Sequence, residues 1–231
     1  LGGMAARVAH EIRTPLSTIR GLLELLQADL PEADLRREYI ARILVAVDRQ
    51  DRLVEDLLSL SNPAPEAWQP IPVRTLLDDV LAMLPPDPRL LRTGDADGAS
   101  PPVWGDPFRL GAVFTNLIQN ALEAAPASGT VEVRVEWPNQ DRVRVSVRNT
   151  GSGIPAELRE RIFQPFFTTR ARGTGLGLTI AREIVDAHRG SLQVVSDGAS
   201  ETTFIVELPT TPPRGVVDAL ATSEIGSAAH G

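Results

Sequence analysis

The sequence contains no cysteine and no lysine. Without cysteine, the chain forms no disulfide and offers no thiolate for catalysis or metal binding. Because every basic residue is an arginine, the Gly-Lys-Ser/Thr loop that binds phosphate in P-loop proteins is excluded. A phosphate site in this chain must therefore use arginine side chains, backbone amides or a metal ion.

The chain also lacks long apolar runs and an excess of positive charge. No stretch approaches the roughly 20 apolar residues that span a bilayer, and the first residues do not resemble a secretory signal. We therefore expect a cytoplasmic fragment without membrane contact, whose upstream part, including any membrane anchor, is missing. The net charge of −7 argues against nucleic acid as the main ligand. The length of 231 residues suits one large or two small domains.

Residues 8–16 contain a histidine in an unusual setting. If this stretch is helical, His10 and Thr14 lie one turn apart on the same face, and Glu11 follows the histidine directly. Pro15 has no backbone N–H and its ring clashes with the carbonyl of Glu11, so we expect the helix to kink just past His10. Taken alone, the pattern more often describes an ordinary surface histidine on a bent helix.

Two long amphipathic helices are predicted at the start of the chain, over residues 5–28 and 35–60, with a polar turn between them. A hairpin of two such helices cannot bury both apolar stripes by itself. We therefore expect two copies to pair as a four-helix bundle, which makes the first domain, residues 1–61, a homodimer. The alternative is that the stripes pack on the rest of the same chain.

A proline-rich linker, residues 62–72, separates this hairpin from a second domain at residues 73–209. Helices are predicted there at residues 73–84, 107–125 and 176–188, with a short helix from Pro155. Strands are predicted at residues 131–137, 143–147, 191–196 and 202–208. Residues 85–102 are expected to be irregular, and residues 210–231 to form a loosely held tail. Helices and strands in separated runs indicate an α+β sandwich with the helices on one face of the sheet.

Two stretches of the second domain offer groups for a nucleotide. Asn116 and Asn120 lie one turn apart on a predicted helix, and their amide oxygens suit a hard cation such as Mg²⁺. Asn149 follows a strand and could hydrogen-bond a purine edge, while Gly151 and Gly153 let a flat ring or a phosphate approach the backbone. Each stretch alone is weak, because solvated asparagines and an ordinary glycine turn give the same pattern.

Two further stretches flank a predicted loop. Three phenylalanines within residues 163–167 precede it, and they could anchor a hinge or simply belong to the core. Gly173, Gly175 and Gly177 open a predicted helix, whose first amides and dipole form a seat for phosphate. This triplet is not a dinucleotide-binding fingerprint, because no parallel βαβ unit surrounds it.

In this order and spacing, the motifs together resemble the catalytic core of two-component sensor histidine kinases over about residues 5–208. The regions that resemble the phosphoacceptor box, the N box, the first glycine box, the F box and the second glycine box are, in that order, residues 10–15, 116–120, 149–153, 163–167 and 173–177. Residues 120–126 are most similar to the nitrogen-regulation branch of these kinases.

The resemblance implies a dimeric four-helix bundle followed by a Bergerat-type ATP-binding α/β sandwich with a mixed sheet. It implies that Asn120 coordinates Mg²⁺ and that Asn116 helps to hold the phosphates of ATP. Residues 154–173 would form a mobile lid, whose Arg170 meets the γ-phosphate, and Thr202 would assist at the adenine. The triphosphate would be lined by Gly173, Gly175 and Gly177.

The same resemblance implies a reaction. His10 would attack the γ-phosphoryl group of Mg-ATP, with Glu11 as general base, and the phosphoryl group would pass to an aspartate of a response-regulator receiver domain. Thr14 completes the Glu-x-x-Thr pattern of the branch that also removes phosphate from the regulator, where the threonine positions the attacking water. Kinase and regulator phosphatase activities are therefore both expected.

One residue departs from the family pattern. The first glycine box usually begins with an aspartate that accepts a hydrogen bond from the adenine amino group, whereas this chain has the neutral Asn149. We expect ATP binding to survive but to be weaker. The substitution keeps open the alternative of a dimeric ATP-binding scaffold or a phosphatase-only pseudo-kinase. Chaperone, topoisomerase and mismatch-repair ATPases share the nucleotide fold but lack the helix around His10.

Overall fold

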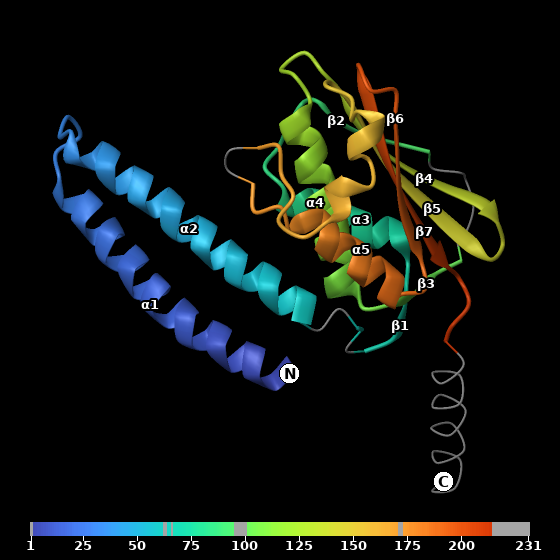
Figure 1. Ribbon diagram of the computed structural model, residues 1–231, viewed down its shortest axis with the longest axis horizontal. Helices are drawn as coiled ribbons and strands as arrows, with labels where there is room; N and C mark the ends of the chain where they lie inside the picture. Colours follow the sequence, from blue (N-terminus) through green and yellow to red (C-terminus); the bar gives the residue numbers. More distant parts are fainter. Residues whose placement is uncertain (1, 62–63, 66, 95–100, 171–172, 214–231) are drawn as a thin grey trace, which may run out of the picture.

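The computed structural model consists of a helical hairpin followed by an α+β unit (Figure 1). It describes residues 2–61, 64–65, 67–94, 101–170 and 173–213, with the side chains of all of these except 2–10, 52, 55 and 59–61. Residues 62, 63 and 66 of the predicted linker, and the predicted tail from residue 214 onward, lie outside this description.

Helices α1 (Gly2–Asp29) and α2 (Arg36–Ser61) form the predicted antiparallel hairpin (Figure 1). α1 runs through Pro15 without interruption. The guanidinium of Arg37 donates hydrogen bonds to two backbone carbonyl oxygens near the end of α1, at 2.5 and 2.8 Å. These carbonyls have no partner within their own helix, so Arg37 closes the turn by satisfying them.

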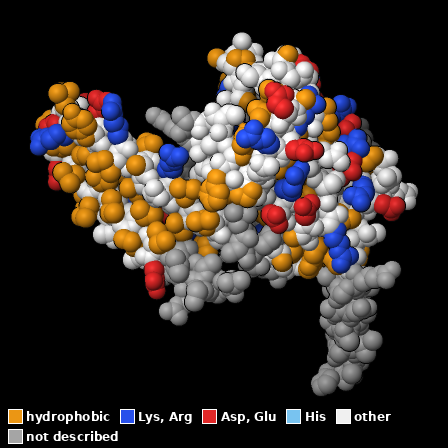
Figure 2. All heavy atoms as spheres, viewed as in Figure 1, with side chains coloured by type: hydrophobic (Ala, Val, Ile, Leu, Met, Phe, Trp, Pro, Cys, Tyr) orange, Lys and Arg blue, Asp and Glu red, His pale blue; other side chains and the backbone are white. Residues whose placement is uncertain are grey.

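Much of the apolar surface of the hairpin is uncovered, and Figure 2 shows apolar side chains gathered along this arm of the molecule. Among the described apolar side chains of the hairpin, Ile40, Val47 and Val54 are buried. Others on the predicted apolar faces remain 42–58% exposed: Ile12, Ile19, Leu22, Leu26, Ile43 and Leu57. Two helices enclose only a narrow seam, so this pattern favours pairing with a second hairpin over packing on the same chain.

The second unit contains, within the described residues, three helices and a five-stranded mixed sheet ordered β2-β4-β5-β7-β6. The helices are α3 (Val73–Met83), α4 (Pro107–Ala124) and α5 (Gly177–Ala187). The strands are β2 (Leu90–Thr93), β4 (Val131–Asn139), β5 (Arg142–Thr150), β6 (Ser191–Ser196) and β7 (Glu201–Pro209). β2 pairs parallel with β4, and the other pairings are antiparallel. All three helices cover one face of the sheet, as the sequence predicted (Figure 1).

Three short strands and two helical turns differ from the prediction. The segment expected to be irregular contains β2, and the end of the expected linker forms β1 (Gln69–Ile71), which pairs with β3 (Val103–Gly105). These strands have three or four residues and show no alternation, because their pairing depends on partners distant in sequence. The short helix expected from Pro155 is replaced by two 3-10 turns, η1 (Ala156–Leu158) and η2 (Arg161–Phe163).

Helix α4 runs through the core and begins where the sequence predicts. Oδ1 of Asp106 accepts hydrogen bonds from the amides of Phe108 and Arg109, at 3.0 and 3.2 Å, and Pro107 occupies the first turn, where an N–H would have no helical partner. The buried face of α4 then packs on the sheet through Leu110, Val113, Phe114, Leu117 and Ile118. Further along the same helix, Asn116 and Asn120 lie at the edge of the core.

Replacing Phe114, which is fully buried, with alanine should lower the free energy of unfolding of the second unit by about 3–5 kcal/mol, because a cavity is left in the core. Phe108→Ala on the same helix is the matched control, since Phe108 is 85% exposed, and it should change this free energy by less than about 0.5 kcal/mol. Urea titration followed by tryptophan fluorescence measures the difference, because Trp104 and Trp137 lie in this unit and Trp68 packs on its His188. Similar losses for both variants would contradict this account of the core.

The uncovered stripe of the hairpin predicts a dimer. The double substitution Ile19→Asp and Leu26→Asp should convert a dimer to a monomer, because carboxylates are costly to bury in an apolar bundle. Met83→Asp is the control: Met83 is 86% exposed on α3, outside the hairpin, and its substitution should leave the dimer intact. Light scattering after size-exclusion chromatography gives the molar mass. A monomeric parent protein, or a double variant that remains dimeric, would show that the stripe is not a dimer interface.

Candidate functional site

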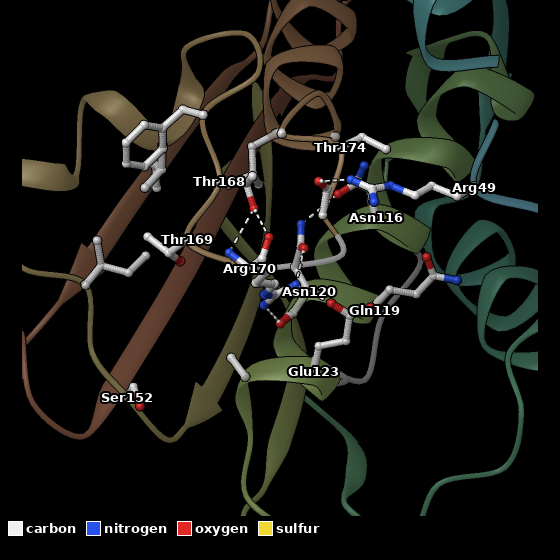
Figure 3. Close-up of a pocket in the computed structure, with 18 of the residues that line it drawn as sticks. Arg49, Asn116, Gln119, Asn120, Glu123, Ser152, Thr168, Thr169, Arg170 and Thr174 are labelled. Atoms are coloured by element: carbon white, nitrogen blue, oxygen red, sulfur yellow. Dashed lines mark hydrogen bonds and ion pairs between the residues drawn. The ribbon is translucent and has the colours of Figure 1, made fainter. Parts of the chain in front are cut away.

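A cavity of about 1230 Å³ lies among α2, α4, the start of α5 and the loop that follows β5 (Figure 3). Nine of the ten residues predicted to bind a nucleotide line this cavity: Asn116, Asn120, Asn149, Gly153, Arg170, Gly173, Gly175, Gly177 and Thr202. Gly151 is the exception. It follows β5, where its N–H donates a hydrogen bond to the carbonyl of Ser200 at 2.9 Å. The structure therefore brings together motifs that are up to 86 residues apart in the sequence.

The two asparagines of α4 face the cavity together. Nδ2 of Asn120 donates a hydrogen bond to Oδ1 of Asn116 at 2.7 Å, as their spacing of one turn allows. The start of α5 packs directly against them, and a Cβ on Gly177 would lie 2.3 Å from Nδ2 of Asn116. A side chain at position 177 would have to displace the amide of Asn116. Within the described residues no side chain caps α5, so its first amides and positive dipole end remain available to an anion beside Asn116.

Arg170 crosses from the loop to the end of α4, as Figure 3 shows. Its Nη1 donates a hydrogen bond to Oδ1 of Asn120 and its Nη2 to the backbone carbonyl of the same residue, both at 2.9 Å. The guanidinium also forms an ion pair with Glu123. The backbone N–H of Arg170 donates to Oγ1 of Thr168 at 3.0 Å, which fixes the local turn. The amide oxygen expected to bind a metal therefore already has a cationic group as its partner.

Asn149 and Thr202 form a neutral wall of the cavity on neighbouring strands. They are register partners in β5 and β7, and both are buried. Nδ2 of Asn149 donates a hydrogen bond to the carbonyl of Thr150 at 3.2 Å, and Oγ1 of Thr202 lies 3.1 Å from Oγ of Ser196. The Asn149 side chain lines the cavity without a formal charge, so this wall presents an amide and a hydroxyl.

The aromatic residues before the loop divide into a buried anchor and an exposed turn. Phe163 is buried, packs edge-to-face on Phe204 with ring centroids 6.4 Å apart, and lies under the guanidinium of Arg182 at 3.6 Å. Phe166 is exposed and has a φ of +64°. A Cβ on Gly175, itself at φ +71°, would lie 2.5 Å from the Phe166 carbonyl carbon. Phe163 thus fixes one end of the loop in the core, while Phe166 and Gly175 turn tightly against each other.

His188, which follows α5, is a positioning residue that the sequence did not reveal. Its ring is fully buried; Nε2 accepts a hydrogen bond from the N–H of Asp106 at 3.0 Å, and Nδ1 donates to the carbonyl of Ile184 at 2.7 Å. These partners define the neutral tautomer with the proton on Nδ1. Burial lowers the pKa of His188 below its ordinary value, so the ring stays neutral near pH 7. His188 therefore ties the start of α4 to the end of α5.

The hairpin forms the remaining wall of the cavity. Nη2 of Arg49 on α2 lies 3.5 Å from the carbonyl oxygen of Gly173, and Oγ1 of Thr174 donates a hydrogen bond to Oδ2 of Asp56 on α2 at 3.0 Å. Figure 3 shows Arg49 directed toward Asn116 and Thr174. This contact could not be predicted from the sequence, because the polar face of an amphipathic helix has the same residue pattern whether it meets water or another part of the chain.

The predicted catalytic residues of the hairpin all lie on α1. Glu11 and Thr14 are exposed and do not line the cavity. His10 is part of the helix, but its side chain is outside the described part of the structure. Of the helices in the described ranges, none has both the length and the apolar character that crossing a membrane requires.

Both parts of the chain match known families. Residues 1–65 match the family described as His Kinase A (phospho-acceptor) domain, and residues 105–212 match the Histidine kinase-, DNA gyrase B-, and HSP90-like ATPase family. The chain is 32% identical over 215 residues to the signal transduction histidine-protein kinase AtoS of Escherichia coli (strain K12), which covers 92% of this chain and 35% of AtoS. It is 36% identical over 212 residues to the sensor histidine kinase ZraS of the same strain, covering 90% and 45% respectively. The chain thus spans less than half the length of these curated relatives.

Solved structures agree with these matches. Full-length ShkA in complex with AMPPNP superposes with a TM-score of 0.74 at 26% identity, over 90% of this chain and 46% of ShkA. Histidine kinase ThkA in complex with response regulator protein TrrA gives a TM-score of 0.64 at 32% identity, over 93% of this chain and 63% of that chain. A nucleotide-free catalytic domain of ThkA is 36% identical, with a TM-score of 0.55, and the match covers 63% of this chain and 99% of that domain. The chain therefore belongs to the histidine kinases, and it comprises the core of a two-component histidine kinase.

Proposed function

We propose that this chain phosphorylates its own His10 with ATP, passes the phosphoryl group to an aspartate of a response-regulator receiver domain, and also removes phosphate from that regulator. Residues 1–61 serve as the dimeric phosphotransfer hairpin and residues 73–209 as the ATP-binding domain. The observation that carries the proposal is the single cavity in which the asparagine and glycine motifs meet one another and face α2 of the hairpin.

The relatives support this proposal. AtoS and ZraS are histidine kinases by name, the ShkA structure contains AMPPNP, and one ThkA structure contains a response regulator. By this likeness ATP is the phosphoryl donor and a receiver domain is the acceptor. Assignment to the nitrogen-regulation branch rests on the similarity of residues 120–126.

The cavity suggests how ATP binds. The adenine lies against Asn149 and Thr202, where a buried amide can exchange hydrogen bonds with the ring edge. The triphosphate lies toward the uncapped start of α5, where backbone amides and the helix dipole favour negative charge. Asn116 adds an amide beside the same position. The wall of the cavity beside the phosphates is formed by Gly173, Gly175 and Gly177.

The residues at Asn120 fit a magnesium ion. Its amide oxygen is a hard ligand, and in this structure it already accepts a hydrogen bond from the guanidinium of Arg170, so the position suits positive charge. When bound, Mg²⁺ neutralises charge on the phosphates. Arg170 has to release Asn120 before that oxygen can ligate a metal, and the freed guanidinium then suits the γ-phosphate, because bidentate contacts to phosphate are strong.

Two phosphoryl transfers follow each other, the first from ATP to His10 and the second from His10 to the regulator. A ring nitrogen of His10 attacks the γ-phosphorus; the P–N bond forms while the bond to the β,γ-bridging oxygen breaks, and ADP leaves with that electron pair. Glu11 accepts the imidazole proton as general base. The phosphoryl group then passes to the carboxylate of the regulator. In the reverse role, Thr14 orients the water that hydrolyses the aspartyl phosphate.

Incubation with γ-labelled ATP and Mg²⁺ should give a label on the protein that is stable to alkali and labile to acid, as expected of a phosphohistidine. His10→Gln should abolish the label without changing nucleotide affinity, because the nucleophile is lost while the cavity is intact. His230→Gln is the control and should keep the label. A label that persists in His10→Gln would refute the assignment of the nucleophile, and a parent protein that binds ATP but takes no label would support the scaffold alternative.

Asn149→Asp should tighten ATP binding by roughly fivefold to tenfold, because a carboxylate makes a charge-assisted hydrogen bond to the adenine amino group where the amide makes a neutral one. The control is Asn139→Asp, which adds the same charge at the exposed end of β4 and should leave affinity unchanged. Isothermal titration calorimetry measures both. Unchanged or weaker binding in Asn149→Asp would mean that the adenine does not lie at this position.

A further inference from the structure

Arg49 reaches from the hairpin into the nucleotide cavity of the second unit (Figure 3). Among the described residues, its hydrogen-bond partner is the carbonyl oxygen of Gly173, at 3.5 Å, which is at the limit of a hydrogen bond. Among the side chains that the structure describes, no carboxylate lies within ion-pair distance of this guanidinium. Arg49 thus brings to the cavity a guanidinium that forms no ion pair with any of these side chains.

The other described arginines of the cavity are compensated. Arg42, two turns earlier on α2, forms an ion pair with Glu38, and Arg170 forms one with Glu123. A charge without a counterion, held at the edge of a cavity, favours an anionic ligand there. The contrast with Arg42 and Arg170 singles out Arg49 as the hairpin residue that is free to bind a ligand.

The residues around Arg49 indicate that the anion that binds there is a phosphate. Asn116 and the start of α5, both placed at the phosphates by the proposed function, line the same cavity. Three separate elements therefore direct hydrogen-bond donors or a positive dipole end at one space. A phosphate oxygen is a stronger acceptor for a guanidinium than the Gly173 carbonyl, so Arg49 can exchange one for the other at little cost.

A second contact keeps Arg49 within reach of the cavity. Asp56 lies seven residues after Arg49, on the same face of α2, and accepts the hydrogen bond of Thr174 at 3.0 Å. Gly173 and Thr174 open the second glycine box, so both contacts from α2 meet the same two residues. The hairpin is thereby docked at the place where the triphosphate would lie.

The geometry points to Arg49 as a positioning residue that binds the terminal phosphate of ATP from the hairpin side. This inference rests on the proposed function, in which the terminal phosphoryl group moves to His10 on the same hairpin. The transferred phosphate must therefore face the hairpin, whereas the α- and β-phosphates lie deeper, toward α5. Arg49 should accordingly distinguish ATP from ADP.

The test compares dissociation constants of the full chain for AMPPNP and for ADP, each with Mg²⁺ at one fixed salt concentration, by calorimetry. Arg49→Ala should weaken AMPPNP binding by about fivefold to twentyfold and leave ADP binding within about twofold. Arg49→Lys should recover part of the loss, because it restores the charge without the fork of donors. Arg36→Ala is the control from the same helix but outside the cavity, where Arg36 pairs with Asp34, and it should alter neither constant.

Each outcome has a distinct meaning. Unaltered ADP affinity in Arg49→Ala shows that the cavity is intact, so a selective loss of AMPPNP affinity supports the inference. Equal losses for both nucleotides would overturn it, since Arg49 would then act only by docking the hairpin, and so would an unaltered AMPPNP affinity. A parent protein that binds neither nucleotide would instead refute the proposed function, and the inference with it.

Discussion

Helices α4 and α5 lie antiparallel and contact each other at two separate places. At one end the buried ring of His188 accepts a hydrogen bond from the backbone of Asp106, which also caps α4. At the other end the bare backbone of Gly177 packs against Asn116. These two contacts hold the amides of α4 and the start of α5 beside the same space. The cavity is a consequence of this double restraint on a pair of helices that the sheet supports.

A chain without lysine handles phosphate in a particular way. Its cations are planar guanidinium groups that make directional, exchangeable hydrogen bonds. In the cavity Arg170 is bonded to Asn120 and Glu123, and Arg49 approaches a backbone carbonyl. Under the proposed function, a phosphate would replace these partners and would bury no new isolated charge, which avoids the large penalty of desolvating an unpaired ion. The same exchange would connect the loop and the hairpin to the ligand, since each supplies one of the arginines.

The sequence predicted the elements whose signal is local and missed those whose signal is not. Two long apolar stripes placed the hairpin within a few residues of its observed ends, and alternating valines placed β4 and β5. β1, β2 and β3 are too short for any periodicity, and they exist because distant segments offer them partners. The motif residues were found because their spacing resembles a family. Arg49 and His188 were not predicted, because a polar helix face and a single histidine have the same sequence pattern whether they contact solvent, a ligand or the core.

The hydrogen bond between Thr174 and Asp56 links the second glycine box directly to α2. Thermodynamic linkage then demands reciprocity: if occupation of the phosphate seat favours the docked arrangement by some coupling free energy, docking must favour occupation by the same amount. A movement of α2 away from the second glycine box would therefore change the affinity for nucleotide. The contact thus gives the hairpin and the nucleotide a direct route by which each can affect the other.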